Sequence, residues 1–278
     1  MAPVFARSVS LPLTPSCKKA SFHVRSVSLP CQSHPIISNH EEQIQTVQSW
    51  ATNPERSSSW IVAGLVQIDL LHTALEDFLQ LSQTLETLQQ SASVDQVLDD
   101  MLQLVDFYGS FLSNIGTLKQ CNSEMQSALR RQDGVQMASS LRSQQRVEKE
   151  MAQLASGFRR MTKCKHLSLS SDAKELEIVM EAICTTAFAS MAVFMGVGAL
   201  SAAASSTKMG SAMKSLKRLA INTSLKKRST DVERDVESLE RLEELEENFR
   251  DIEFSSERLF RSLINSRISL LNIRTFSW

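Results

Sequence analysis

The sequence predicts an all-α protein in which an antiparallel bundle of long helices follows a disordered N-terminal head. All six prolines lie at or before Pro54, so residues 55–278 contain no proline that would interrupt a helix. Only eight glycines occur, and apolar residues recur at intervals of three and four, the spacing of one helix face. Stretches in which β-branched and polar residues alternate, as strands require, are missing. With 42% apolar residues, the chain can build a large core.

The composition divides the chain into a head of residues 1–40 and a helical domain of residues 41–278. The head is rich in serine, proline and basic residues and has no acidic residue. Such a segment cannot bury enough apolar surface to fold, so we expect it to be disordered. An acid-free segment rich in arginine and serine is also typical of an organelle transit peptide. A transit peptide does not need the perfect repeat that the head contains, which favours a different role.

The first two predicted helices are separated by a proline turn. We expect a short helix over Glu41–Ala51, which the turn at Asn53-Pro54 ends. Ser58 or Ser59 then caps a helix that continues to about Gln80. Its apolar stripe consists of Ile61, Leu65, Ile68, Leu71 or His72, Leu75 and Phe78.

The next two helices are predicted from their end signals. Ser93 followed by Gln96 forms a capping box and opens a long helix. The segment Arg130–Gly134 is typical of its end, with basic residues against the helix dipole and Gly134 in the left-handed conformation. A fourth helix then covers about Val135–Met161 and has a basic exposed face.

A fifth helix starts at Ser171-Asp172 and contains an uncharged stretch, Ala182–Ala204. This stretch is long enough to span a bilayer, which takes about 20 mostly apolar residues. The basic segment Lys208–Arg228 would then lie on the cytoplasmic side. The other interpretation is a central helix buried in the bundle. We favour it because the amphipathic helices on both sides need a partner to pack against.

A second capping box, Thr230 with Glu233, opens the last helix, over about Asp231–Asn272. Its apolar stripe suits bundle or coiled-coil packing, and we expect Leu242 and Leu245 to face other helices. The stripe consists of Val232, Val236, Leu239, Leu242, Leu245, Phe249, Ile252, Leu259, Leu263 and Leu270. Twelve acidic residues against three arginines over residues 231–257 give the opposite face an acidic character.

The residues predict no catalytic, cofactor or metal site. The motifs of metalloproteases, serine hydrolases and phosphate-binding loops are missing, and we interpret Gly196-Val197-Gly198 as close helix packing. The five scattered cysteines form no CxxC pair, so we expect neither a zinc site nor a disulfide framework. Basic faces without interleaved aromatic residues do not indicate a nucleic-acid partner. We expect a non-enzymatic protein without a small-molecule substrate, in the reducing cytoplasm or, if Ala182–Ala204 spans a bilayer, at a membrane.

The head contains a perfect internal repeat, because Arg7–Pro12 and Arg25–Pro30 have the same sequence, Arg-Ser-Val-Ser-Leu-Pro. The pattern matches the phosphoserine motif that 14-3-3 adaptor proteins bind, in which an arginine cluster holds the phosphate. The predicted docking residues are Arg7, Ser10, Pro12, Arg25, Ser28 and Pro30. The other interpretations are a plain kinase target and a chance repetition in a low-complexity segment.

Three segments resemble the plant BYPASS-like family, a group defined by a domain of unknown function. They are Ser21–Pro30 with His34-Pro35 after it, Gln126–Arg131, and Leu259–Ile273. The resemblance covers about residues 21–278. It implies a plant protein that is helical throughout and acts in root and shoot development, and it carries over no catalytic residue. It also implies that a single membrane span is an option at Ala182–Ala204.

Overall fold

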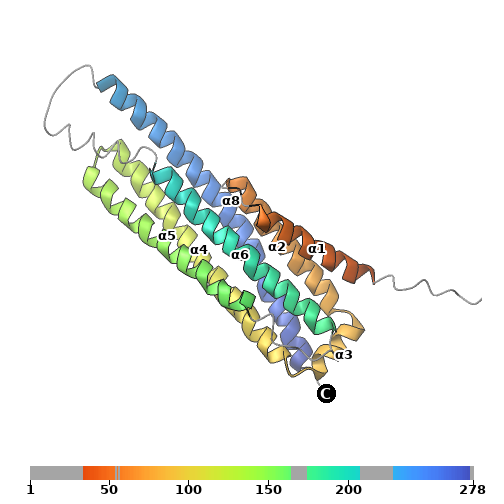
Figure 1. Ribbon diagram of the computed structural model, residues 1–278. Coiled ribbons are helices and arrows are strands. Elements are labelled where there is room, and N and C mark those ends of the chain that lie inside the picture. The colour runs from red at the N-terminus through yellow and green to blue at the C-terminus, as the bar shows by residue number, and fades with distance from the viewer. Residues whose placement is uncertain (1–33, 54, 56, 164–173, 207–227, 276–278) are drawn as a thin grey trace, which may run out of the picture. The chain divides into compact units, whose positions relative to one another are not determined.

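The computed structural model describes residues 34–53, 55, 57–163, 174–206 and 228–275, and all the regular structure in these ranges is helical. The helices are α1 (Pro35–Thr52), α2 (Ser58–Leu79), α3 (Ser82–Gln90), α4 (Val94–Arg130), α5 (Gly134–Lys163), α6 (Lys174–Ser206) and α8 (Arg228–Thr275). Figure 1 shows the long helices lying side by side. The all-α prediction is confirmed.

The long helices reverse direction from one to the next along α4, α5 and α6. Helix α4 packs between α5 and α8, α6 packs on α5 and α2, and α1 lies on α2 and α6. Helices α4 and α8 are antiparallel, because Asp95 near the start of α4 pairs with Arg274 at the end of α8. Helices α2 and α8 run in the same direction, because Asp69 contacts Arg258 and the later Glu76 contacts Ser266.

Four aromatic rings fill the middle of the core. The rings of Phe111 and Phe194 stack with centroids 4.0 Å apart, and Phe158 and Tyr108 meet Phe194 edge-on. The Tyr108 hydroxyl lies 2.8 Å from the hydroxyl of Ser190, so its one polar group has a partner. These contacts join α4, α5 and α6, which makes α6 a central element of the bundle.

The first helix begins at Pro35, six residues before the predicted start at Glu41. The side chain of His34 accepts a hydrogen bond of 3.3 Å from the Ile36 amide, and a proline in the first turn loses no helical bond. Residues 35–40 are therefore helical, contrary to the prediction of a disordered head up to residue 40. Residues 1–33 of the predicted head lie outside the described residues.

Two predicted helix caps and one helix differ from the structure. The α2 cap is Ser57, not Ser58 or Ser59, and its side chain accepts from the Trp60 amide at 3.2 Å. Helix α3 was not predicted, because it is short and buries only two side chains, Thr84 and Leu88. Ser93 makes no side-chain capping bond at the start of α4, so the predicted capping box does not form.

The turn between α4 and α5 also differs from the prediction. The left-handed residue is Gln132, with φ 57°, and Gly134 is already the first residue of α5. The carboxylate of Asp133 accepts bonds of 3.0 Å from the amides of Val135 and Gln136. Asp133 thus caps α5. The left-handed Gln132 belongs to the end of α4, where the amides of Gln132 and Asp133 donate to the carbonyls of Leu129 and Ala128 at 3.1 and 2.8 Å.

The uncharged stretch Ala182–Ala204 lies within α6, and its predicted start at Ser171-Asp172 is outside the described residues. Val193, Phe194 and Val197 are fully buried, while Met195 is 54% exposed. Two described helices, Ser58–Leu79 and Lys174–Ala204, are long and apolar enough to cross a membrane, but 56% and 61% of their apolar windows are buried in the bundle. This packing is what the interpretation as a buried bundle helix requires.

Close helix contact accounts for Gly196 in α6, whereas a Cβ on Gly198 would meet only Met151 at 4.0 Å. A Cβ on Gly196 would lie 3.2 Å from the Ile61 side chain and 3.3 Å from that of Trp60. The absence of a side chain therefore lets α6 approach α2, as expected from the sequence.

The apolar stripe of α8 is buried along most of its length. Leu242 and Leu245 are 3% and 4% exposed, which confirms that both face other helices. Val236 is 50% exposed and is therefore wrongly placed in the predicted stripe. The predicted capping box at Thr230 and Glu233 falls within α8, which begins at Arg228, and those side chains are outside the described part.

Candidate functional site

A row of polar side chains crosses the apolar interface between α2, α6 and α8, and we call it the buried polar seam. The seam consists of Asp69 and His72 from α2, Thr186 from α6, and Arg258, Ser262 and Ser266 from α8. Residues three or four apart lie on the same face of a helix, so α2 and α8 each direct their members to one side. His72, Thr186 and Ser266 are 0% exposed.

Asp69 holds a negative charge inside the protein. Its carboxylate accepts a bond of 2.7 Å from the Arg258 guanidinium and one of 2.5 Å from the Ser262 hydroxyl. The side chain of Asp69 is 7% exposed, whereas that of Arg258 is 53% exposed. The arginine thus stays partly hydrated, while the carboxylate depends on its protein partners. Removal of the arginine would therefore destabilise the protein, because it would leave a buried carboxylate without its counter-charge.

His72 lies at the junction of three helices. Its Nδ1 is 3.2 Å from the Ser266 hydroxyl and its Nε2 is 3.0 Å from the Thr186 hydroxyl. Ser266 in turn donates to Glu76 at 3.5 Å, which leaves its oxygen free to accept from Nδ1–H. Burial, the largest effect, lowers the pKa of His72 to about 4; Asp69 raises it and the nearby His40 lowers it further. His72 is therefore neutral at physiological pH.

The seam contains the residue types of a hydrolytic triad but not its bonding pattern. Asp69 binds Arg258 and Ser262, whereas a triad aspartate orients the histidine. Two open hollows in the described ranges, of about 780 and 560 Å³, are lined by other residues. The hydrogen bonds and the ion pair of the seam join α2, α6 and α8.

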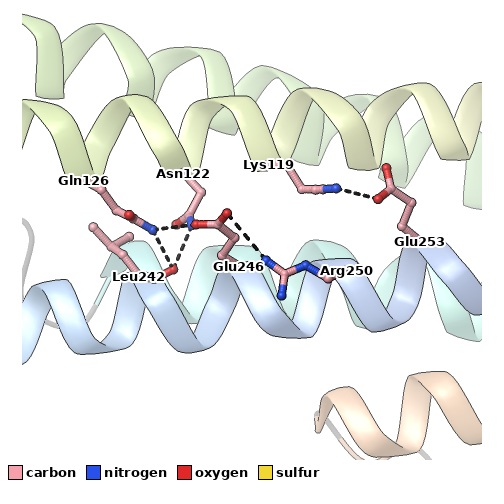
Figure 2. A network of polar contacts seen from close by, with 7 residues as sticks. All are labelled: Lys119, Asn122, Gln126, Leu242, Glu246, Arg250 and Glu253. Atoms are coloured by element: carbon pink, nitrogen blue, oxygen red, sulfur yellow. Dashed lines mark hydrogen bonds and ion pairs between the residues drawn. The ribbon is translucent and has the colours of Figure 1, made fainter.

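A second polar network joins α4 to the first half of α8 (Figure 2). The carbonyl of Leu242 accepts bonds of 2.8 Å from Asn122 and 3.2 Å from Gln126. Gln126 also donates to Glu246 at 3.0 Å, and further along Lys119 pairs with Glu253. These contacts fix the register between two helices whose apolar stripes alone would allow sliding.

The predicted docking residues Arg7, Ser10, Pro12, Arg25, Ser28 and Pro30 all lie outside the described residues, so the structure does not bring them together with any site. In the ranges that are described, no three His, Cys, Asp or Glu side chains are grouped as metal ligands. Cys121 and Cys184 are buried, and the Cys184 thiol donates to the Met161 carbonyl at 3.8 Å. Burial, reinforced by Glu124, raises the pKa of Cys121.

Sequence reasoning missed the seam. One signal was present, because Asp69 and His72 interrupt the apolar face of α2, where polar side chains need partners. Their partners come from positions more than one hundred residues away, so no local pattern could identify them.

A family model described as Protein BPS1 matches residues 64–273, which include the whole seam and the α4–α8 network. No curated protein and no solved structure matches the chain.

Proposed function

The chain belongs to the Protein BPS1 family, and on that premise we propose that it is a non-enzymatic regulatory and interaction protein that acts in plant root and shoot development. The observation that carries the proposal is the bonding of the buried polar seam, in which Asp69, His72 and Ser266 are bound to other helices of the bundle. Groups used in this way stabilise one arrangement of helices. A stable bundle is a scaffold on which surfaces can be displayed to protein partners.

Two oppositely charged faces support a role in binding helical partners. On α5 the exposed Arg142, Arg146 and Lys149 give a basic face, and on α8 the exposed Glu240 and Glu247 belong to an acidic one. Such separated fields attract partners of opposite charge and speed their encounter. The proposed partners are proteins, with no nucleic acid, cofactor or small-molecule substrate.

The head supplies the second part of the proposal, a phosphoserine docking segment for a 14-3-3 dimer. Phosphorylation of Ser10 and Ser28 would add about −1.5 to −2 charges and three acceptor oxygens at each site. The two serines are eighteen residues apart, a length of chain that reaches at most about 60 Å when extended and spans about 23 Å as a flexible coil. One chain could thus fill both grooves of one dimer, which would raise affinity roughly 10²–10⁴-fold over either site alone.

Peptides covering Val4–Gln32 test this docking directly. The doubly phosphorylated peptide should bind a 14-3-3 dimer more tightly than either singly phosphorylated form, and the Ser10→Ala, Ser28→Ala peptide should not bind. Equal affinity of the double and single forms would rule out bivalent docking. If no phosphorylated form binds, the repeat is a kinase target or a chance repetition.

Proximity labelling in plant cells tests the interaction role of the whole chain. Because α1 begins at Pro35, the deletion should remove residues 1–33 and leave α1 intact. We expect the full chain to label 14-3-3 proteins in the cytoplasm and the shortened chain to lose them while keeping the partners of the bundle. Identical labelling by both chains would contradict a docking head.

A second candidate function is that of a membrane-associated protein anchored by residues 182–204. It is favoured by the length and hydropathy of α6, which pass the requirements for a membrane span. The burial of the same helix supports the first candidate instead. The two candidates differ in where the intact protein is found, in solution or in the membrane.

A further inference from the structure

Helix α1 covers a face of the bundle formed by α2 and α6. Its buried side chains are His40, Ile44, Val47 and Ala51. The Trp50 ring stacks on Trp60, with centroids 4.2 Å apart, and its N–H donates to the Trp60 carbonyl at 3.1 Å. Gln48 adds a bond of 3.2 Å to Thr185 of α6. Most of this contact is apolar, so α1 is held by burial and by the tryptophan pair.

His40 is the exception in this contact. It is 0% exposed, and neither of its ring nitrogens has a hydrogen-bond partner. Its ring lies against Phe78, with centroids 5.7 Å apart. A neutral imidazole tolerates such a site at some cost, but an imidazolium would bring an unpaired charge into it. Burial accordingly lowers the pKa of His40 to about 4.

Within the described ranges, no charged side chain is bonded to the His40 ring. On α2, His72 is itself affected by His40, which lowers its pKa, and the carboxylate of Asp69 is already bound to Arg258. The half of α6 that faces the start of α1 carries Lys174, Glu175, Glu177 and Glu181, and none of them bonds to His40. Of these, Glu175 is held by Gln83. On α1 itself, Glu41 and Glu42 are exposed to solvent.

We propose that α1 is a releasable cover of the α2–α6 face, held in place while His40 is neutral and released when His40 is protonated. Release places the imidazolium in water and uncovers Phe78, Trp60 and the surface around Gly64. The surface below belongs to α2 and α6, the two described helices apolar enough to enter a membrane.

The size of the effect follows from the two protonation states. With a pKa of 6.5 for the released histidine and about 4 for the docked one, the docked state loses stability as the pH falls below about 6.5. The docking equilibrium should weaken about tenfold between about pH 7.5 and about pH 5.5, and by no more than one further factor of ten per pH unit below that.

Hydrogen exchange on the full chain at about pH 7.5 and about pH 5.5 tests the proposal. After correction for intrinsic exchange rates, the protection of amides in Pro35–Thr52 should fall about tenfold more than that of amides in α4. The comparison with α4 separates release of α1 from destabilisation of the whole bundle through His72. The circular dichroism couplet of the stacked Trp50 and Trp60 reports the docked fraction, and it should weaken only where the tenfold change takes that fraction appreciably below one.

Two variants identify the responsible group. His40→Leu cannot be protonated and should keep α1 protected at both pH values. His34→Asn removes an exposed histidine but keeps a capping side chain, and should respond as the unmodified chain does. Unchanged protection of α1 in the unmodified chain, or an equal loss in His40→Leu, would overturn the proposal. The exchange data on the unmodified chain decide the first point even if the leucine variant does not fold.

Discussion

Asp69 on α2 and Arg258 on α8 form an ion pair of 2.7 Å between residues that are 189 positions apart in the chain. The carboxylate is buried and the guanidinium is half exposed. The two partners therefore contribute unequally to stability, because only the aspartate loses most of its access to solvent. The pair anchors α8 to α2 near the middle of the bundle, and its asymmetry can be measured.

Loss of the arginine should cost more than loss of the aspartate charge. Arg258→Leu leaves a buried carboxylate with Ser262 as its remaining partner and should lower the free energy of unfolding by about 2–4 kcal/mol. Asp69→Asn removes the buried charge and keeps an acceptor, so it should cost about 1–2 kcal/mol. Urea denaturation of both single variants measures the difference. Equal costs would show that the pair behaves as a solvated surface bridge.

Protonation of His72 should make stability depend on pH. The folded pKa of about 4 lies below the unfolded value of 6.5, so the unfolded chain takes up a proton first as the pH falls. This histidine should therefore remove about 1.4 kcal/mol by about pH 5.5 and about 3 kcal/mol below about pH 4.

The matched variant for this effect is His72→Gln, which keeps a hydrogen-bonding side chain but does not titrate. Urea denaturation between about pH 7.5 and about pH 5.5 should show a shallower pH dependence for this variant than for the unmodified chain. Parallel curves would mean that His72 is already accessible to protons in the folded protein.

Gly64 allows Trp50 to reach α2. A Cβ at residue 64 would lie 2.0 Å from the ring of Trp50, which is fixed by its stacking on Trp60. Gly64→Ala should therefore cost about 1–3 kcal/mol and weaken the tryptophan couplet. Gly116→Ala is the matched control, because nothing lies within 4 Å of its added Cβ, and it should stabilise α4 by about 0.5–1 kcal/mol. Thermal unfolding measures both, and stabilisation by both would contradict the close contact.

Leu242 belongs to a small apolar cluster with Met125, Leu129 and Met137, at the end of α4 and the start of α5. Truncation to alanine leaves a cavity there, and Leu242→Ala should lower the free energy of unfolding by about 2–5 kcal/mol. Val236→Ala is a suitable control on the same helix, because Val236 is 50% exposed and should change stability little. An unchanged melting temperature for Leu242→Ala would indicate that this half of α8 is a solvated rod.

The helix faces, which follow from the spacing of apolar residues, were predictable from the sequence. The contacts between side chains of different helices were not. The stripe through Leu242 and Leu245 identified the buried face of α8, because 3–4 spacing translates directly into one side of a helix. The caps were less predictable. Ser57, Ser58 and Ser59 are all suitable caps by type, and tertiary packing selects which of them starts the helix.

The polar seam shows a different limit. Asp69 and His72 are visible in the sequence as polar residues on an apolar face, but their bonds depend on how α6 and α8 are placed against α2. The predicted docking serines, Ser10 and Ser28, come from a motif whose action requires a kinase and a partner. The fold of the isolated chain therefore does not test that prediction, and the titration with phosphorylated peptides does.

The central claim is that α6 is an inner helix of a self-contained bundle, and alkaline carbonate extraction of plant-cell membranes tests it most directly. With Val193, Phe194 and Val197 already buried by protein, the full chain should be recovered in the supernatant and should stay in solution without detergent. Retention in the extracted membrane pellet, together with protease protection of one flank of α6 in sealed microsomes, would contradict the claim. That result would establish residues 182–204 as a membrane span.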